Sequence, residues 1–159
     1  MIIIALDQAT KHTGWAVFEG SLPKKYGILR ADNVSCRLTY MSNMIFRMIE
    51  QVNPDMVVFE DTAYQSNADV YKTLCQLQGA IIGYCTEHDT PYVILKPTVW
   101  RKRLGFEQGN LKRAELKAMA IRYVKERFGL EVPEDTAEAI CIGCAFWREE
   151  EEDEEEREC

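Results

Sequence analysis

The feature that most constrains the fold of this chain is a pair of short, continuous apolar runs, each closed by one acidic residue. Residues 2–6 end in Asp7, and residues 56–59 end in Glu60. A strand that is apolar on both faces has to be covered by helices on both faces, so each run predicts a central strand of a sheet. The chain therefore predicts an α/β fold in which two carboxylates follow two buried strands.

The segments around these runs complete the pattern. Residues 14–18 and 25–30 predict two more strands, the first forming an antiparallel hairpin with residues 2–6, and residues 92–95 predict another buried strand. Apolar residues spaced three and four apart predict helices at 36–52, 67–87, 111–128 and 133–147. This order predicts a mixed β-sheet of about five strands flanked by helices on both faces.

Length and composition indicate a single globular domain. The chain has 159 residues, of which 47% are hydrophobic, enough for one well-formed core. We expect no membrane helix, because no run approaches the roughly 18 consecutive apolar residues that one needs. We also expect no signal peptide, because residues 1–6 lack a basic segment. A cytoplasmic protein is therefore expected.

Charge is distributed very unevenly along the chain. The net charge is −7, yet residues 149–159 hold nine acidic residues and one basic residue, which leaves residues 1–148 at +1. Residues 96–128 carry ten basic residues against three acidic ones. We expect an acidic, disordered tail at 149–159 after a domain at 1–148, and a basic surface suited to a polyanion.

The six cysteines are spaced irregularly and predict free thiols rather than disulfides or a zinc site. We expect them to be buried apart from the terminal one; they are Cys36, Cys75, Cys85, Cys141, Cys144 and Cys159.

Two further acidic residues open the last predicted helix. Asp135 and Glu138 are three residues apart and so share one face of that helix. If strands 2–6 and 56–59 are neighbours, Asp7 and Glu60 lie side by side and the helix can present its acids to the same point. Clustered carboxylates repel one another, and hard ions such as Mg²⁺ or Mn²⁺ relieve the repulsion. Simpler interpretations exist for single acids: Asp135 could be a helix cap, and Asp7 could begin an Asx-turn.

Four short motifs resemble those of the RuvC-like Holliday junction resolvases, which have an RNase H-like fold. The motifs are Ile4-Ala5-Leu6-Asp7 with Thr13-Gly14-Trp15, Val57-Val58-Phe59-Glu60, Asn67-Ala68-Asp69 and Asp135-Thr136-Ala137-Glu138-Ala139. Each motif alone is weak, but their shared order and spacing are specific. Gln8-Ala9 stands where the bacterial enzymes usually have Pro-Gly, which indicates a phage-type branch.

The resemblance implies a site and an activity. Asp7, Glu60, Asp135 and Glu138 would ligate Mg²⁺ or Mn²⁺, two ions per site, and Lys112 would assist at the scissile phosphate. Lys117 is a weaker candidate for that role. The family's junction-wedging aromatic falls on Ala63, so Tyr64 beside it is the candidate for stacking on DNA. The implied enzyme is a homodimeric, metal-dependent endonuclease that cleaves branched DNA such as four-way junctions, in a bacterial or phage-infected cell.

The basic surface is expected to contact the DNA backbone rather than read bases. Its candidate residues are Arg101, Lys102, Arg103, Lys112, Arg113 and Lys117.

Three other functions fit part of the pattern. An RNase H-type or ribosomal-RNA-processing nuclease would keep the fold and change the substrate. A nucleotide-binding relative of actin and the sugar kinases shares the opening strand and the Thr-Gly turn, but it needs two such domains. A catalytically inactive DNA-binding module would have no reason to keep all four acids.

Overall fold

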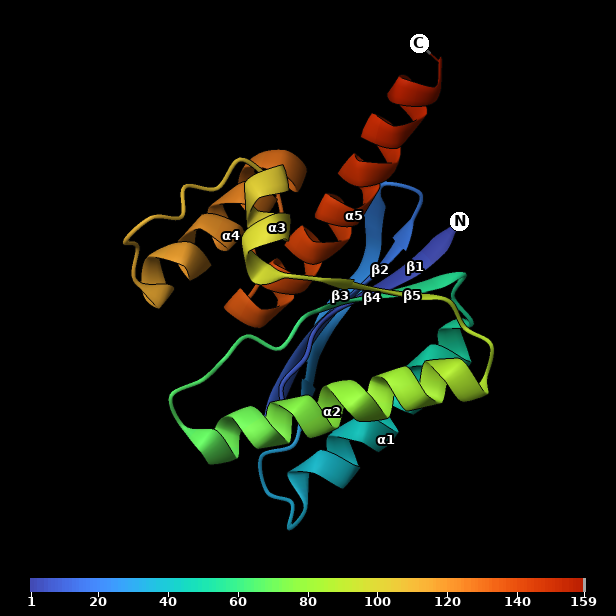
Figure 1. Ribbon diagram of the computed structural model, residues 1–159, viewed down its shortest axis with the longest axis vertical. Coiled ribbons are helices and arrows are strands. Elements are labelled where there is room, and N and C mark those ends of the chain that lie inside the picture. Colours follow the sequence, from blue (N-terminus) through green and yellow to red (C-terminus); the bar gives the residue numbers. More distant parts are fainter. Residues whose placement is uncertain (159) are drawn as a thin grey trace.

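A five-stranded mixed sheet runs through the centre of the molecule, which is a computed structural model describing the backbone of residues 1–158 and the side chains of residues 1–148 (Figure 1). The strand order is β3-β2-β1-β4-β5, with β1 parallel to β4 and antiparallel to β2. The strands are β1 (Ile2–Asp7), β2 (His12–Glu19), β3 (Leu22–Arg30), β4 (Met56–Glu60) and β5 (Tyr92–Leu95). The predicted mixed sheet and the predicted β1–β2 hairpin are confirmed.

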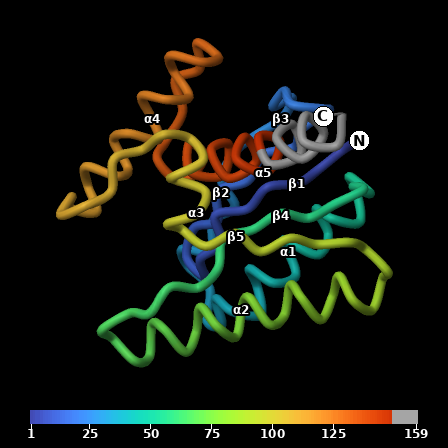
Figure 2. The backbone as a smooth tube through the Cα atoms, turned by 45° about the horizontal axis from the view of Figure 1, so that its top comes forward, coloured from blue at the N-terminus to red at the C-terminus, as the bar shows by residue number. Residues whose placement is uncertain are grey.

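Helices cover both faces of this sheet, as predicted (Figures 1 and 2). One face carries α1 (Arg37–Val52) and α2 (Ala68–Glu87), and the other carries α3 (Pro97–Arg103), α4 (Arg113–Phe128) and α5 (Glu134–Glu158). The short helix α3 begins at a proline, whose fixed φ suits a first helical position.

The central strand β1 supplies both halves of the core. Ile3 and Ala5 pack into the cluster under α4 and α5, whereas Ile4 and Leu6 pack into the cluster over α1 and α2. All four side chains are fully buried. The alternation follows from the two-residue period of a strand, and it explains why the run at 2–6 is apolar throughout.

A glycine on helix α5 lets the helix pack closely against the sheet. A Cβ atom built on Gly143 would meet the ring of Phe18 at 2.3 Å, so only glycine fits at this crossing. At the start of the helix, the Thr136 hydroxyl donates a hydrogen bond to the Gly27 carbonyl of β3 at 3.1 Å. These contacts set the position of the first turn of α5 relative to the strands.

The described cysteines are free, which confirms that prediction, but their burial differs from it in two cases. Cys36 and Cys75 are exposed, because one precedes α1 and the other lies on the outer side of α2. No helix among the described residues is long and apolar enough to cross a membrane. The acidic tail predicted at 149–159 overlaps the end of α5, whose backbone is described to Glu158. Its side chains lie outside the described ones, and its predicted disorder stays a prediction.

Candidate metal centre

Two acidic residues meet at one edge of the sheet because their strands are parallel neighbours. Leu6 of β1 pairs with Phe59 of β4, so Asp7 and Glu60 follow at the same level of the sheet. The carboxyl ends of adjacent parallel strands are a common place for ligands to bind in α/β proteins. The neighbouring position of these two strands, on which the convergence of the acids depends, is therefore confirmed.

The first turn of α5 brings two more carboxylates to this edge. Gly14 of β2 lies opposite Asp7, and a Cβ atom built on it would meet the Asp135 carbonyl oxygen at 1.8 Å. Thr13 closes the preceding turn, since its hydroxyl donates to the Ala9 carbonyl at 2.7 Å and accepts from the Ala9 amide at 3.2 Å. The Thr13-Gly14 pair thus shapes the turn after Asp7 and lets α5 approach it.

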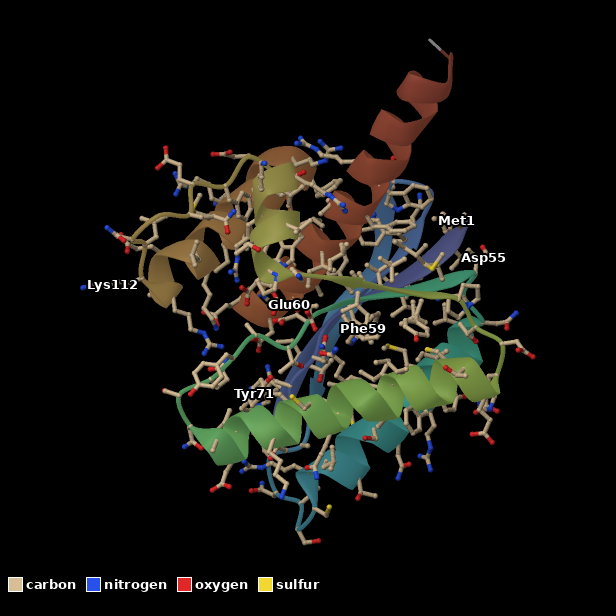
Figure 3. All side chains as sticks on the ribbon, in the orientation of Figure 1. Met1, Asp55, Phe59, Glu60, Tyr71 and Lys112 are labelled. Carbon is tan, nitrogen blue, oxygen red and sulfur yellow. The ribbon has the colours of Figure 1, made fainter. Side chains whose placement is uncertain are left out.

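Three of the four acids form a tight cluster. Carboxylate oxygens of Asp7, Asp135 and Glu138 lie within 4.8 Å of one another, a spacing suited to a shared cation. The cluster lines a cavity of about 300 Å³, which Glu60 lines as well. Figure 3 shows Glu60 at the junction of the sheet and α3. All four predicted ligands therefore face one cavity, although Glu60 stands outside the tight cluster.

Glu60 is held by groups from α3. The indole N–H of Trp100 donates to Glu60 Oε1 at 2.8 Å, and Arg101 Nη2 lies 4.0 Å from the same oxygen. Arg101 Nη2 also lies 3.6 Å from Glu138 Oε1, so it contacts acids of both β4 and α5. In the sequence, Trp100 and Arg101 belong to a basic stretch, and nothing there indicates that they contact Glu60. The one general signal for the Trp100 contact is that an indole N–H needs an acceptor when it becomes buried.

Gln8 adds a fixed polar group beside the acids. Its side-chain amide donates to the Glu60 backbone carbonyl, and this orientation leaves Gln8 Oε1 buried without a hydrogen-bond partner in the described part of the chain. Gln8 thereby joins the ends of β1 and β4. The sequence identifies it only as a departure from the bacterial pattern.

Burial and mutual repulsion shift the titration of the acids. Burial raises the pKa of the Asp7 carboxyl well above its ordinary value, and the charges of the neighbouring carboxylates raise it further. Burial also raises the pKa of Glu60 and of Glu138, although Arg101 opposes both shifts. These shifts mean that, without a cation, the folded site holds protons more tightly than the unfolded chain does.

The stability of the metal-free protein is therefore expected to fall as the pH rises. An acid whose pKa is raised by folding contributes most at low pH, and the contribution is lost between about pH 4, the ordinary carboxyl value, and the raised value. We expect a higher unfolding temperature at pH 5.5 than at pH 7.5 in a chelator, measured by calorimetry. Mn²⁺ should stabilise the protein more at pH 7.5, because ions bind deprotonated carboxylates. A metal-free unfolding temperature that rises over this interval would contradict the argument.

The predicted DNA-contacting residues divide into two groups. Arg101, Arg113 and Lys117 line the cavity, where Lys117 is ion-paired with Glu134. Lys102 is exposed on α3, and Arg103 accepts a hydrogen bond at its backbone carbonyl from Arg148 at 2.7 Å.

Lys112 does not line the cavity, although the resemblance implies a role there. Figure 3 shows it at the outer end of α4, away from Glu60. Its backbone N–H donates to the Glu115 carboxylate at 2.7 Å, so it precedes the helix as a cap residue. Arg113 and Lys117, four residues apart, share the helix face toward the acids, and Lys112 is one step off that face.

Tyr64 lies in the segment between β4 and α2, and its side chain is 79% exposed. Its ring centroid is 5.6 Å from that of Tyr71, which Figure 3 shows on α2. Asn67 begins the following helix, where its side chain accepts from the backbone N–H groups of Asp69 and Val70. The exposed ring is available for stacking, and its role on DNA stays a prediction.

Sequence comparison finds several curated relatives that share one name. No family model matches the chain. The crossover junction endodeoxyribonuclease RuvC of Dictyoglomus thermophilum is 24% identical, over 92% of this chain and 96% of its own length. The protein of the same name from Rickettsia akari is 27% identical, over 89% of this chain and 94% of its own length. The predicted resemblance to the RuvC-like resolvases is confirmed, and these relatives carry the predicted enzyme class, an endonuclease, in their names.

Comparison with solved structures finds chains of similar fold. T. thermophilus RuvC in complex with a Holliday junction substrate superposes with a TM-score of 0.75 at 15% identity, over 96% of each chain. The Fowlpox virus resolvase in complex with Holliday junction DNA superposes with a TM-score of 0.66 at 19% identity, over 94% of this chain and 98% of its own. The predicted RNase H-like fold is thereby confirmed.

Proposed function

We propose that this chain is a structure-specific endodeoxyribonuclease that hydrolyses phosphodiester bonds in four-way junctions and other branched DNA with two divalent metal ions. The observation that carries the proposal is the convergence of four carboxylates, from β1, β4 and α5, on one cavity. Similarity to RuvC proteins over about nine-tenths of the chain supports the choice of substrate.

The donor set fits Mg²⁺ or Mn²⁺. The cluster offers carboxylate oxygens, the ligands that these hard ions prefer, and its described members include no thiolate. The raised pKa of Asp7 and of Glu138 reflects a desolvated acidic site in which a cation would be favourable. Asp7, Asp135 and Glu138 would hold one ion, and Glu60 would join Asp7 in holding the other. When bound, such ions supply an activated water and stabilise the leaving oxygen of phosphodiester hydrolysis.

The protein's own groups would position the reacting parts. Trp100 orients the Glu60 carboxylate through its indole N–H, and Gly14 lets the first turn of α5 reach Asp7. Arg113 and Lys117 lie on the cavity wall, where they would bind phosphate oxygens of the strand to be cut. We favour Lys117 over Lys112 for the contact nearest the scissile phosphate, because Lys117 lines the cavity.

A homodimer would allow paired cuts in opposing strands of a junction. The candidate interface is α2, which buries only Leu77, Ile81 and Cys85 in its own fold and lies on the outside of the molecule (Figures 1 and 2). A two-fold interface uses the same patch on both copies, so α2 would pack against α2 of the second copy.

The proposal predicts metal-dependent cleavage of a synthetic four-way junction. We expect wild type with Mg²⁺ or Mn²⁺ to make paired nicks in the junction and to leave a linear duplex, a flap and an RNA–DNA hybrid largely uncut. Glu60→Gln should bind the junction without cutting it, since its amide oxygen can still accept from Trp100 while its charge is lost. Denaturing gels resolve the products, and a mobility shift measures binding.

Glu131→Gln is the matched control, because Glu131 is an exposed acid whose partner is Lys125 on the far end of α4. It should cut like wild type. Cleavage confined to the RNA–DNA hybrid would reassign the protein to the RNase H-type activity. No metal-dependent cutting of any of the four substrates would end the nuclease proposal.

A further inference from the structure

Arg101 lines the cavity that holds the four acids, although Lys102, the next residue on α3, is exposed. Its side chain is 17% exposed, and its Nη2 lies 3.6 Å from Glu138 Oε1 and 4.0 Å from Glu60 Oε1. A guanidinium keeps its charge at any pH that the protein survives. Arg101 therefore places a permanent positive charge within 4.0 Å of acids of both β4 and α5.

Stacking rather than a full set of hydrogen bonds holds this guanidinium. Arg101 Cζ lies 4.8 Å from the ring centroid of Trp100, which is fully buried. Arg101 Nε is buried and has no hydrogen-bond partner in the described part of the chain. An unpartnered buried donor costs free energy, so the position depends on the two carboxylates and the indole. A guanidinium held in this way can exchange its carboxylate partners for others.

We propose that Arg101 is a resident cation of the metal centre. It neutralises Glu60 and Glu138 while the site holds no ion, lowers the affinity for the ion that Glu60 would bind, and contacts a substrate phosphate once that ion is present. The inference rests on the proposed function. Its physical basis is that two cations sharing the same carboxylates repel each other. The released guanidinium has the planar donor geometry that pairs with phosphate oxygens.

A purely structural ion pair would behave in the opposite way. If Arg101 only tied β4 to α5, removing it would loosen Glu60 and weaken ion binding. If it is a resident cation, removing it takes away a competing charge and strengthens ion binding. The sign of the change in affinity therefore separates the two roles.

The test is titration calorimetry of Mn²⁺ into the full-length protein without DNA. We expect Arg101→Gln to bind Mn²⁺ about tenfold more tightly than wild type, the lower end of what a unit charge within 4–6 Å does to a charged site. Arg101→Lys keeps the charge and should bind like wild type. Arg47→Gln makes the same change at an exposed position of α1, on the opposite face of the sheet, and should have no effect.

Thermal unfolding in a chelator first verifies that each variant is folded. If Arg101→Gln is not folded, Arg101→Met replaces it, because methionine also removes the charge and keeps a long, unbranched side chain beside Trp100. Unchanged or weaker Mn²⁺ binding by the neutral variant would overturn the proposal, as would the absence of binding by every variant. The transfer to phosphate predicts that Ca²⁺ strengthens junction binding more in wild type than in the neutral variant, and an equal gain would refute it. Junction cleavage by wild type is measured separately, so failure here leaves the proposed activity standing.

Discussion

Replacing Asp7 with asparagine is expected to lower the rate of junction cleavage by at least about a hundredfold while making the metal-free protein more stable. The loss of rate is of the size seen when a preorganised electrostatic group is removed from an active site. The gain in stability follows from the raised pKa of Asp7: burial and the neighbouring carboxylates make its ionisation cost more free energy in the folded protein than in the unfolded chain. Asparagine keeps the shape and removes the charge, so the unfolding free energy should rise.

Calorimetry and cleavage assays on the same samples measure both effects. Each 1 kcal/mol gained corresponds to about 2–4 °C in a chain of this size, so we expect the unfolding temperature in a chelator to rise by several degrees. Mn²⁺ should stabilise wild type strongly and the variant only weakly, since an ion stabilises the state that binds it. Asp89→Asn, at an exposed position whose φ of 50° suits asparagine equally, is the control and should change neither quantity. A less stable metal-free Asp7→Asn protein would show that the carboxylates support the fold rather than strain it.

Replacing Gly14 with alanine is expected to disrupt the centre without touching any ligand. The added methyl would lie 1.8 Å from the Asp135 carbonyl oxygen, and a backbone atom cannot move aside by changing rotamer. The first turn of α5 would have to shift, taking Asp135 and Glu138 with it. We expect a loss of about 3 kcal/mol of unfolding free energy, at the upper end of the range for overpacking. A displacement of about 1 Å can cost a hundredfold in rate, so cleavage should fall at least that far.

Gly83→Ala on α2 provides the matched control for that substitution. Apart from its chain neighbours and the backbone of its own helix, nothing lies within 4 Å of the methyl that it would add. Alanine in a helix interior is favoured over glycine by about 0.5–1 kcal/mol. The same chemical change should therefore stabilise the protein at Gly83 and destabilise it at Gly14. Stabilisation of Gly14→Ala by Mn²⁺ to the same extent as wild type would show that the metal ligands had not moved.

Local patterns in the sequence predict the strands, the helices and the four acids of this protein. Continuous apolar runs predict buried strands and three- and four-residue spacing predicts helices, because each pattern reports how a segment buries its own side chains. The two strand-ending acids, Asp7 and Glu60, and the helical pair Asp135 and Glu138 are likewise recognisable from their positions within single elements. The order of elements then leaves few arrangements of the sheet, and the observed one contains the predicted β1–β2 hairpin and the β1–β4 pairing on which the site depends.

The tertiary structure alone decided which basic residues reach the acids. Arg101 faces Glu60 and Glu138, whereas Lys112 points away from them, although both lie in the same basic stretch of the sequence. Lys112 immediately precedes Arg113, so its side chain projects in a different direction around the axis of α4 from those of Arg113 and Lys117. No local pattern in the sequence indicates which face of that helix meets the cavity. Contacts such as Gly14 with Asp135 join residues far apart in the chain, so their distances depend on how the packed helices settle on the sheet. Sequence periodicity reports which side chains a segment buries, whereas the charge balance of the centre depends on what each buried side chain meets.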